Sequence, residues 1–402
     1  MRNLKVYYSI EDNFPPYRVD VAELFGRALP ELGVDVEWYM RRVKPGGCSV
    51  ENYGEQKVHL PCLSGRNGSF WKVINKLSFW QCDVWQLLRC LGKQIDIIQV
   101  RDKYIAAIFG LLVARIKGVP FVYWCSYPFP EHYLELAKMS VGIRRLYCHF
   151  HGTMGKLILY RFVMPLSDHV FIQSEQMKRD IAAYGVPESK MTPVPMGVPE
   201  KIFAATQISP VVIQLGQIVY IGTLAAVRRL HVLIEAFAEV HLRCPDARLV
   251  VVGDGDAPWE RASLEQLARQ LGLDQAIRFT GFLPIEHAWE IAASAAVCIS
   301  PFYPTKVLAS TSPTKLVEYM ALGRPVVCND HPEQLEIIRE SGAGLCVGWG
   351  QKEFADAMIW MLEHPEEAEA MGAKGPAWVT ENRTYCEIAR KVYAKYLEIK
   401  NS

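Results

Sequence analysis

The chain has 402 residues, half of them hydrophobic, and its formal net charge of +1 almost cancels. This length allows two sizeable cores, and the hydrophobic, nearly neutral composition excludes an intrinsically disordered chain and gives no sign of nucleic-acid binding. We therefore expect a globular protein with two domains.

The eleven cysteines are scattered and contain no CxxC pair, so neither a zinc motif nor a redox motif is predicted. The first residues contain no apolar stretch of signal-peptide length, and the longest apolar run, "YIAAIFGLLVA", is too short to span a bilayer. We expect a cytoplasmic protein in a reducing compartment, and contact with the inner face of a membrane stays open.

Strand-like and helix-like segments alternate along the first half of the chain. The predicted strands cover residues 4–10, 34–40, 95–100, 120–124 and 167–174, and the predicted helices cover residues 20–33, 103–118 and 175–185. Repeating βα units indicate a parallel sheet covered by helices on both faces.

From about Glu200 to Val212 the pattern dissolves into what we interpret as an interdomain connection. A second βα series follows, with strands predicted over residues 217–224, 248–256, 276–283, 296–301, 324–327 and 342–348. The fold class is therefore α/β, with two tandem Rossmann-like, doubly wound domains facing across a cleft. We assign residues 1–200 to an acceptor-binding domain, 213–378 to a nucleotide-sugar-binding domain, and 379–402 to a C-terminal helix that crosses back.

The stretch "SPTKLVEYMALG" predicts a helix with a cation at its start. Ser312 suits the N-cap, Pro313 suits the first helical position, and Lys315 lies in the first turn. A cation at a helix N-terminus is unfavourable by about 0.3–1 kcal/mol unless an anion is bound there. The sequence therefore predicts an anion near Lys315, although a solvated helix end is the alternative.

A second cationic turn follows the strand that ends at Gly222. Arg228 and Arg229 precede the next helix, and no carboxylate lies beside them in the sequence. Arginine offers a bidentate fork and lysine a point charge, so Arg228 and Lys315 together could hold a diphosphate. For either cation alone, a solvated helix end explains the sequence equally well.

Glu318 lies three residues after Lys315 on an otherwise apolar helix. A carboxylate there could accept two ribose hydroxyls, and the alternative is a salt bridge to Lys315. Gly253 follows a strand where a backbone can approach a ligand, but the full GxGxxG fingerprint is missing and NAD binding is disfavoured. Asp254 and Asp256 supply too few oxygen ligands to hold a metal ion, so no metal site is predicted.

The first half offers fewer candidates for chemistry. Tyr127, Glu131 and His132 follow a predicted strand, where they are candidates for contacting a sugar or taking the proton of an acceptor. A loop cap with a surface histidine is the alternative. Residues 136–167 contain no acidic side chain, and residues 68–88 resemble them in their mixture of basic, aromatic and apolar residues. Such amphipathic helices can lie on anionic membranes, or they can simply pack on a sheet.

Several segments of the second half, from "YIGTLAAVRRL" through "VVVGDGD" and "IRFTGFLP" to "SPTKLVEYMALGRPVV", carry a resemblance by their order and spacing. They resemble the nucleotide-binding domain of retaining glycosyltransferases with the GT-B fold, of the family 4 or group 1 kind. That family includes bacterial mannosyl-, glucosyl- and N-acetylglucosaminyltransferases of polysaccharide and lipid-sugar synthesis. The segment after Ser167 is similar to the one by which these enzymes leave their acceptor domain.

The resemblance implies roles for single residues. Arg228 stands where the family has a lysine that contacts the donor diphosphate, and Glu318 stands where a glutamate holds the ribose. Phe282 lies in the segment that meets the base, and Arg18, after Tyr17, lies where a loop approaches the donor phosphates. Further donor-binding candidates lie in the same loops and helix start: Gly222, Thr223, Gly253, Ser310, Thr311 and Thr314.

The sequence departs from the family at Ser310 and Thr223, where a glutamate and an arginine are usual. The hydroxyls cannot replace either charge, so the identity of the sugar and the position of its anomeric carbon are put in doubt. The Ser-Pro-Thr-Lys start recurs in a branch of the family that lacks this glutamate, which implies that Lys315 takes over a phosphate contact.

We therefore expect a retaining hexosyltransferase that uses a nucleotide-diphosphate sugar and a glycan or lipid-linked acceptor. Transfer requires placing the acceptor hydroxyl and stabilising the departing diphosphate, so two cations make a metal or other cofactor unnecessary. The alternative is a non-catalytic nucleotide-sugar-binding partner of a glycosyltransferase complex. An epimerase or hydrolase is disfavoured because no hydrolytic constellation is seen.

Overall fold

The computed structural model describes residues 3–206 and 212–401. The chain forms two compact units, one comprising residues up to Pro195 together with those from Tyr385, and the other comprising Met196–Thr384. The expected connection between the domains begins with the 3-10 helix η5 (Glu200–Thr206), and its residues 207–211 lie outside the described residues.

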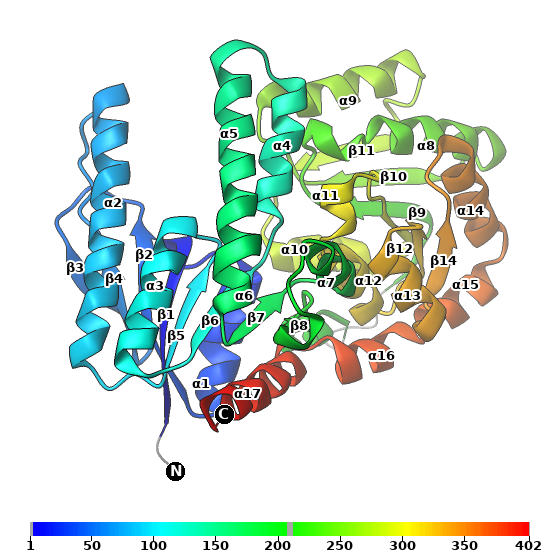
Figure 1. Ribbon diagram of the computed structural model, residues 1–402. Helices are drawn as coiled ribbons and strands as arrows, with labels where there is room; N and C mark the ends of the chain where they lie inside the picture. Colours follow the sequence, from blue (N-terminus) through cyan, green and yellow to red (C-terminus); the bar gives the residue numbers. More distant parts are fainter. Residues whose placement is uncertain (1–2, 207–211, 402) are drawn as a thin grey trace. The chain divides into compact units, whose positions relative to one another are not determined.

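Unit 1 contains an eight-stranded sheet in the order β3-β4-β2-β1-β5-β6-β7-β8 (Figure 1). All neighbouring strands pair in parallel except β3 and β4, which form an antiparallel hairpin at one edge. The strands are β1 (Leu4–Phe14), β2 (Val34–Arg42), β3 (Ser49–Tyr53), β4 (Gln56–Leu60), β5 (Ile97–Arg101), β6 (Phe121–Cys125), β7 (His169–Ile172) and β8 (Met191–Pro193). The hairpin was not predicted, because its polar, largely exposed β3 lacks the apolar alternation of a half-buried strand.

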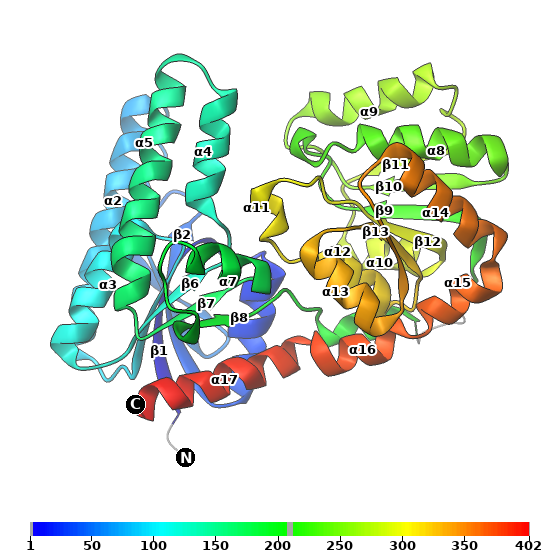
Figure 2. The ribbon, with the colours of Figure 1, turned by 45° about the vertical axis from the view of Figure 1, so that its right-hand side comes forward.

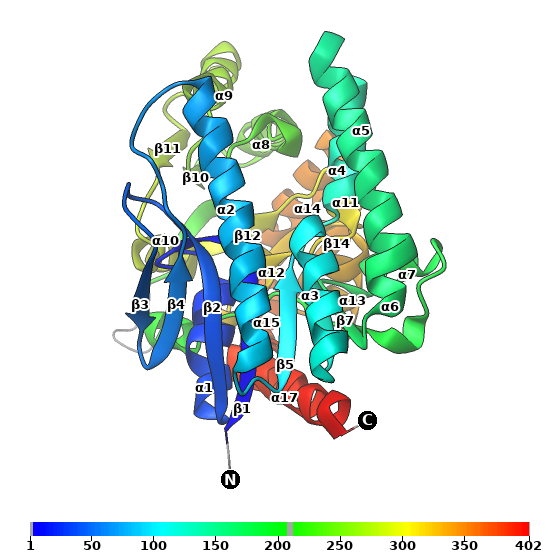
Figure 3. The same cartoon turned by 60° about the vertical axis from the view of Figure 1, so that its left-hand side comes forward.

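Helices cover both faces of this sheet because successive side chains of a strand point to opposite faces. In β1, Val6 and Tyr8 pack in one core with η1 and α17, while Tyr7 packs in another with α2 and α3. Figure 3 shows α2 and α3 in front of the strands of this second face. The helices are the π-helical η1 (Asp20–Ala28), α1 (Leu29–Glu31), α2 (Ser69–Arg89), η2 (Cys90–Gly92), α3 (Tyr104–Lys117), α4 (Phe129–Met139), α5 (Gly142–Ile158), η3 (Leu159–Val163), α6 (Met164–Leu166), α7 (Glu175–Ala182), η4 (Glu188–Lys190) and α17 (Tyr385–Asn401).

The C-terminal helix α17 belongs to unit 1. Its Tyr385, Val392 and Tyr396 side chains are buried in the core beneath β1. The Tyr396 hydroxyl donates a 2.6 Å hydrogen bond to Gln99 Oε1 on β5. The last helix of the chain thus completes the core of the first sheet.

Unit 2 contains a six-stranded, wholly parallel sheet in the order β11-β10-β9-β12-β13-β14. Its strands are β9 (Gln214–Ile221), β10 (Arg248–Val252), β11 (Ile277–Gly281), β12 (Ala295–Ser300), β13 (Val326–Asn329) and β14 (Gly344–Val347). Its helices are η6 (Ala226–Arg228), α8 (His231–Arg243), α9 (Pro258–Gln270), α10 (Ile285–Ala293), α11 (Lys306–Ala309), α12 (Thr314–Ala321), α13 (Pro332–Ser341), α14 (Gln351–Glu363), α15 (Pro365–Gly372) and α16 (Gly375–Asn382).

The same alternation divides the core of unit 2 into two layers. Ile218 and Tyr220 of β9 face a layer formed by α8, α9 and α14, and Val219 faces a layer formed by α10, α12 and α13. Figure 2 shows α12 and α13 beside each other on the second face. The prediction of two tandem, doubly wound α/β domains is confirmed by these two sheets.

Candidate functional site

The carboxyl ends of β9, β10 and β11 approach one another through glycines. Gly253 has φ 133°, and a Cβ atom there would lie 2.0 Å from the Gly222 carbonyl oxygen, so only glycine fits. The Gly253 amide donates a 3.0 Å hydrogen bond to the Gly281 carbonyl oxygen, and Gly222 bonds to Val252 in the same way at 2.9 Å. Bare backbone therefore forms this edge of the sheet, as a closely bound ligand requires.

Lys315 lies in the first turn of α12 and reaches this glycine edge. A Cβ atom on Gly222 would lie only 3.1 Å from Lys315 Cε. The Lys315 Nζ atom lies 5.3 Å from the ring centroid of Tyr220 and 4.9 Å from that of Phe302. Lys315 is buried, and within residues 3–206 and 212–401 no carboxylate forms an ion pair with it.

Burial lowers the pKa of the Lys315 ammonium well below its usual value, and the nearby charge of Arg228 lowers it further. A buried cation that faces aromatic rings and a second cation is electrostatically unfavourable without a counter-ion. The arrangement fits an anionic ligand that approaches Lys315 and Arg228 together.

Glu318 lies one turn further along α12 and is also buried. Burial raises the pKa of its carboxyl to about 7, while the indole N–H of Trp289 and the charge of Lys315 oppose that shift. The described residues show no ion pair between Glu318 and Lys315, so the predicted alternative of a salt bridge is not found. Glu318 retains the acceptor capacity that ribose hydroxyls need.

Arg228 is held by Thr223, one of the two residues at which the sequence departs from the family pattern. Its Nε atom donates a 2.7 Å hydrogen bond to the Thr223 hydroxyl, and the Tyr220 hydroxyl donates one of 3.1 Å to the Thr223 carbonyl oxygen. Arg229 instead adopts a left-handed conformation with φ 54° and lies over the ring of Tyr303. Thr223 thus orients Arg228, although it does not replace a charge.

A carboxylate does contact the turn that leads to Arg228, although none lies beside that turn in the sequence. Glu260, from the first turn of α9, accepts hydrogen bonds of 2.7 Å from the Ala226 amide and 3.0 Å from the Ala257 amide. These amides lower the pKa of the Glu260 carboxyl. Its position three residues into a helix that begins with proline was the available signal, since that is a capping position.

The predicted N-cap of α12 is wrong. The helix begins at Thr314, and Pro313 precedes it without any side-chain cap. The Ser312 hydroxyl instead accepts from the Met196 amide at 3.0 Å and donates to Glu333 Oε1 at 2.8 Å. Glu333 is buried and also accepts a 2.7 Å hydrogen bond from Arg383. A buried carboxylate requires hydrogen-bond donors, so the Ser312 hydroxyl bonds to Glu333 and does not cap α12.

The remaining donor candidates occupy two different environments. Ser310 is buried, and its hydroxyl donates to the Lys306 carbonyl oxygen at 3.2 Å, while the Thr311 hydroxyl donates to Leu308 at 2.7 Å. Thr314 is the partly buried first residue of α12. Phe282 follows β11 with 84% of its surface exposed, so its ring is available to a base. Their donor-binding roles stay predictions.

In unit 1, two of the acceptor candidates contact each other. The Tyr127 hydroxyl lies 3.2 Å from His132 Nδ1, and burial lowers the pKa of His132. Glu131 accepts a 2.8 Å hydrogen bond from the Tyr160 hydroxyl and forms a 3.2 Å ion pair with Lys156. Glu131 is thus held by two neighbours, and its role in proton transfer stays a prediction.

Arg18 follows β1 and is partly exposed, beside the exposed Tyr17. Its Nε atom lies 3.3 Å from Asp20 Oδ1, and the other Asp20 oxygen accepts a 2.5 Å hydrogen bond from the fully buried Arg101. Sequence reasoning missed Arg101, the last residue of β5. An arginine at the carboxyl end of an apolar strand was the available signal.

A buried polar cluster in unit 1 was also missed. The Ser9 hydroxyl donates to Asp83 Oδ1 at 2.6 Å, and Lys103 Nζ donates to Asp83 Oδ2 at 2.9 Å. Burial lowers the pKa of Lys103. A single aspartate in the apolar and basic α2 was the available signal for a buried partner.

Within the described ranges, no group of three or more His, Cys, Asp or Glu side chains is placed to hold a metal ion. Of the two aspartates considered in the sequence, Asp254 and Asp256, the first places its Oδ2 atom 3.6 Å from Arg261 Nη1.

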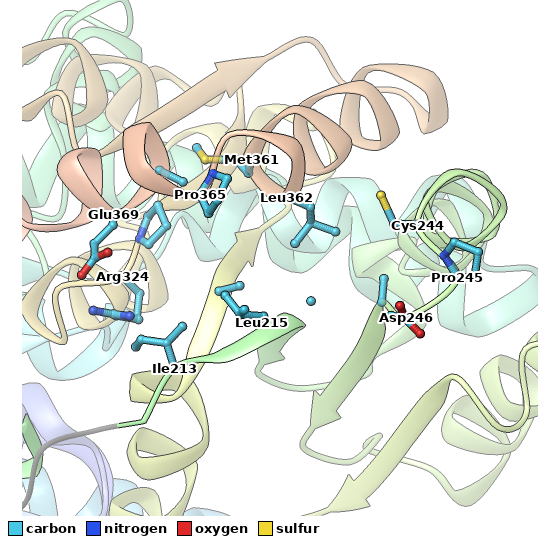
Figure 4. A pocket seen from close by; sticks show the side chains of 15 residues that line it. Ile213, Leu215, Cys244, Pro245, Asp246, Arg324, Met361, Leu362, Pro365 and Glu369 are labelled. Atoms are coloured by element: carbon cyan, nitrogen blue, oxygen red, sulfur yellow. The ribbon is translucent and has the colours of Figure 1, made fainter.

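A mostly apolar cavity of about 360 Å³ lies at the amino ends of β9, β12 and β13, where Leu215, Ala296 and Pro325 line it (Figure 4). Parallel sheets bind ligands at the opposite, carboxyl ends, so this cavity is separate from the candidate site.

Two family models match adjacent parts of the chain. The model for glycosyltransferase family 4 matches residues 21–201, and the model for glycosyl transferases group 1 matches residues 216–364. The second match falls within unit 2, and the first covers most of unit 1 and extends from Met196 to residue 201 of unit 2.

Curated relatives match across much of the chain. A D-inositol 3-phosphate glycosyltransferase of Corynebacterium aurimucosum is 22% identical, with coverage of 86% of this chain and 82% of that protein. A GDP-mannose-dependent alpha-(1-6)-phosphatidylinositol monomannoside mannosyltransferase of Mycobacterium tuberculosis is 26% identical, with coverage of 67% and 74%.

Solved structures share the whole fold. Sucrose-phosphate synthase from Thermosynechococcus elongatus superimposes with a TM-score of 0.73 at 17% identity, covering 99% of both chains. Anabaena HepE in complex with UDP and glucose gives 0.68 at 16% identity, covering 98% of this chain and all of that one. The chain therefore belongs to the glycosyltransferases of the family 4 and group 1 kind and has the GT-B fold.

Proposed function

We propose that the protein is a retaining glycosyltransferase that moves a hexose from a nucleotide-diphosphate sugar to a glycan or lipid-linked acceptor in polysaccharide or cell-envelope synthesis. The observation that carries the proposal is the pair of cations, Lys315 and Arg228, beside the glycine edge of the unit 2 sheet. Neither cation forms an ion pair among the described residues.

In this proposal the two cations stabilise the negative charge that develops on the diphosphate as its bond to the anomeric carbon breaks. The acceptor oxygen then forms the new bond on the same face of the sugar, and its proton passes to the departing diphosphate. Lys315 is a buried point charge and Arg228 a fork oriented by Thr223, so a metal ion is not needed. Glu318 accepts the ribose hydroxyls and so fixes the donor.

Unit 1 supplies the acceptor side of the proposal. Tyr127, His132 and Glu131 follow the carboxyl end of β6, the edge at which parallel sheets bind ligands. The names of the mycobacterial and corynebacterial relatives include a phosphatidylinositol monomannoside and an inositol phosphate, which favour an acceptor with a polar head. We extend this to a lipid-linked acceptor.

The outer surface of unit 1 supports a location at the inner face of a membrane. Val141 and Ile143 are each 86% exposed, and Phe150 on α5 is 67% exposed. Arg144 and Arg145 alternate with these apolar side chains, as in helices that lie on anionic lipid. No helix in the described ranges combines the length and apolarity needed to cross a bilayer.

The second candidate function is a nucleotide-sugar-binding partner without activity. Ser310 favours it, because its hydroxyl bonds back to α11 where the family usually has a glutamate that meets the sugar. This partner would bind a donor through Lys315, Arg228 and Glu318 but would transfer nothing.

The two candidates are separated by binding and turnover. We expect UDP or GDP to raise the melting temperature, and one nucleotide sugar to release its nucleoside diphosphate in the presence of an acceptor and of EDTA. Binding without release over a broad donor and acceptor panel would support the partner. If Arg228→Ala and Glu318→Ala left nucleotide binding unchanged, the site assignment would fall, and activity restored only by magnesium would overturn metal independence.

Membrane binding is tested separately by flotation with vesicles. We expect the protein to float with vesicles rich in phosphatidylglycerol and to remain free with pure phosphatidylcholine. Ile143→Asp with Phe150→Asp should abolish flotation, while Leu242→Asp, at an 85% exposed leucine of unit 2, should not. Equal flotation of both variants would contradict the assigned face.

A further inference from the structure

Three cysteines that are far apart in the sequence gather at the edge of the unit 1 sheet. Cys48 and Cys62 lie between two antiparallel pairings, Ser49 with Leu60 in the β3–β4 hairpin and Gly46 with Leu63 beyond it. The two sulfurs are 2.7 Å apart, and the Cys48 amide donates a 2.9 Å hydrogen bond to the Cys62 sulfur. The fold therefore brings the two thiols into direct contact across neighbouring segments of chain.

A third thiol lies within reach of this pair. Cys82, on α2, places its sulfur 3.7 Å from that of Cys48. Cys48 and Cys62 are exposed and Cys82 is partly buried. The sequence contains no CxxC pair, so its spacing gave no sign of this contact.

The surroundings of the thiols are basic. Cys62 lines a cavity of about 360 Å³ whose described lining includes Arg41, Arg42, Lys72 and Lys76. Arg41 pairs with Glu11 and Arg42 with Glu51, both outside that lining, so Lys72 and Lys76 are the cations of the cavity without an ion pair among the described residues. Cations beside an exposed cysteine favour the reactive thiolate form. Contact with Cys48 raises the pKa of the Cys62 thiol. Either sulfur can act as the S–H donor in this contact.

We propose that Cys48 and Cys62 form an oxidative modification site that reacts with hydroperoxides and closes into a reversible disulfide, with Cys82 as a third thiol able to exchange with it. The proposal rests on the contact of the sulfurs, their exposure and the basic surroundings. It is independent of the proposed glycosyl transfer.

The chemistry balances with a hydroperoxide as the oxidant. The Cys48 thiolate attacks one peroxide oxygen, the O–O bond breaks, and hydroxide leaves to become water, which turns Cys48 into a sulfenic acid. The Cys62 sulfur then attacks the Cys48 sulfur, the S–O bond breaks, and a second water leaves with the Cys62 proton. Two electrons pass from the two sulfurs to the peroxide, and a dithiol reductant reverses the product by exchange.

The disulfide would join the segment before β3 to the segment after β4, at the wall of the basic cavity. Attack of the Cys82 thiolate on Cys48 would release Cys62 and join the same segment to α2 instead. Either product restricts this edge of the sheet, because a cross-link removes freedom from the segments that it joins.

The experiment treats the full-length, reduced protein with graded hydrogen peroxide, blocks free thiols with an alkylating reagent, and maps the peptides by mass spectrometry. We expect two of the eleven cysteines to become protected first, with Cys48 linked to Cys62, and dithiothreitol to restore both. Cys48→Ser should abolish this protection, whereas the matched control Cys244→Ser, at a partly buried thiol of unit 2, should leave it unchanged.

Other outcomes would overturn the proposal. They are full alkylation of Cys48 and Cys62 after oxidation, oxidation of either cysteine to a sulfinic acid without a cross-link, or faster disulfide formation elsewhere in the chain. Protection of all three thiols by added Zn²⁺ in the absence of peroxide would also overturn it, because the cluster would then be a metal site. Cys82→Ser should retain the Cys48–Cys62 link and lose only the exchange product with α2.

Discussion

The Nε atom of Arg228 donates a 2.7 Å hydrogen bond to the hydroxyl of Thr223. Thr223 is itself fixed, because its carbonyl oxygen accepts from the hydroxyl of the buried Tyr220. The residue that departs from the family pattern therefore sets the direction of a cation that we assign to the donor diphosphate. The loss of a charge at this position is accompanied by a new role in orientation.

Replacing the Thr223 hydroxyl tests this relationship. Thr223→Val keeps the shape of the side chain and removes the acceptor, so Arg228 loses its orientation. Nucleotide affinity should fall by about tenfold or more, the effect of one hydrogen bond to a charged group. Thr223→Ser keeps the acceptor and should retain affinity. Calorimetric titration with UDP and GDP checks both, and equal affinities for the two variants would contradict the assigned contact.

Replacing Lys315 should separate binding from stability. Lys315→Met removes a buried cation that has no ion pair among the described residues, and it keeps the apolar stem. The free energy of unfolding without nucleotide should therefore rise by about 1 kcal/mol or more. Nucleotide affinity should fall at least about tenfold, since a charge-assisted contact is lost. Thermal unfolding and calorimetric titration measure the two effects.

The matched control for Lys315 is Lys306, an exposed lysine on the neighbouring α11. Lys306→Met should change neither stability nor affinity by more than about 0.5 kcal/mol, as surface substitutions usually do. If Lys315→Met destabilised the protein without nucleotide, the cation would have a structural partner and its assignment to an anion would be wrong.

Glu318 should make stability depend on pH. Its pKa is raised from 4.5 to about 7 in the folded state, so the folded state binds this proton more tightly than the unfolded state does. Compared with Glu318→Gln, the stabilisation by the protonated group is complete below pH about 4.5 and is lost as pH rises through about 7, a change of about 3 kcal/mol.

The measurement is the free energy of unfolding of both proteins by denaturant between pH 4.5 and pH 8. A difference that stayed constant with pH would show that the Glu318 carboxyl is not desolvated. If the carboxylate accepts ribose hydroxyls, UDP affinity of the unaltered protein should rise through pH 7, and that of Glu318→Gln should not.

The alternation of apolar strands and amphipathic helices was sufficient to predict both sheets, because parallel strands buried on both faces leave a clear record in sequence. The β3–β4 hairpin left no such record, since β3 is mostly exposed and polar. The hairpin also explains why the contact between Cys48 and Cys62 was invisible. Sequence separation of fourteen residues says nothing about which segments pair.

The candidate site was predictable where a residue broke a local rule. Lys315 places a cation at the start of a helix, where an anion is preferred, and Gly253 places a glycine directly after a strand. Both lie at the carboxyl edge of the unit 2 sheet. Ser312 and Glu260 could not be placed, because their partners Glu333 and Ala226 come from distant parts of the chain. Long-range hydrogen bonds decide such positions, and local pattern does not contain them.

The glycine edge gives a last prediction about the fold of the site. Gly253→Ala introduces both a strained backbone, with φ 133°, and a Cβ atom 2.0 Å from the Gly222 carbonyl oxygen. Gly272→Ala, in the same unit, introduces a positive φ of 71° with no atom within 4 Å of the new Cβ. The two variants therefore differ in the steric overlap and in the backbone strain, since a φ near 70° is open to alanine and a φ of 133° is not.

We expect Gly272→Ala to cost about 1 kcal/mol of unfolding free energy, the usual cost of a left-handed alanine, and Gly253→Ala to cost more than about 3 kcal/mol. If Gly253→Ala folds by moving Gly222 away, UDP affinity should fall as well, because Lys315 packs against Gly222. Denaturant unfolding and calorimetric titration of the soluble variants measure both effects, and similar costs at the two positions would show that β9 and β10 do not approach as closely as described.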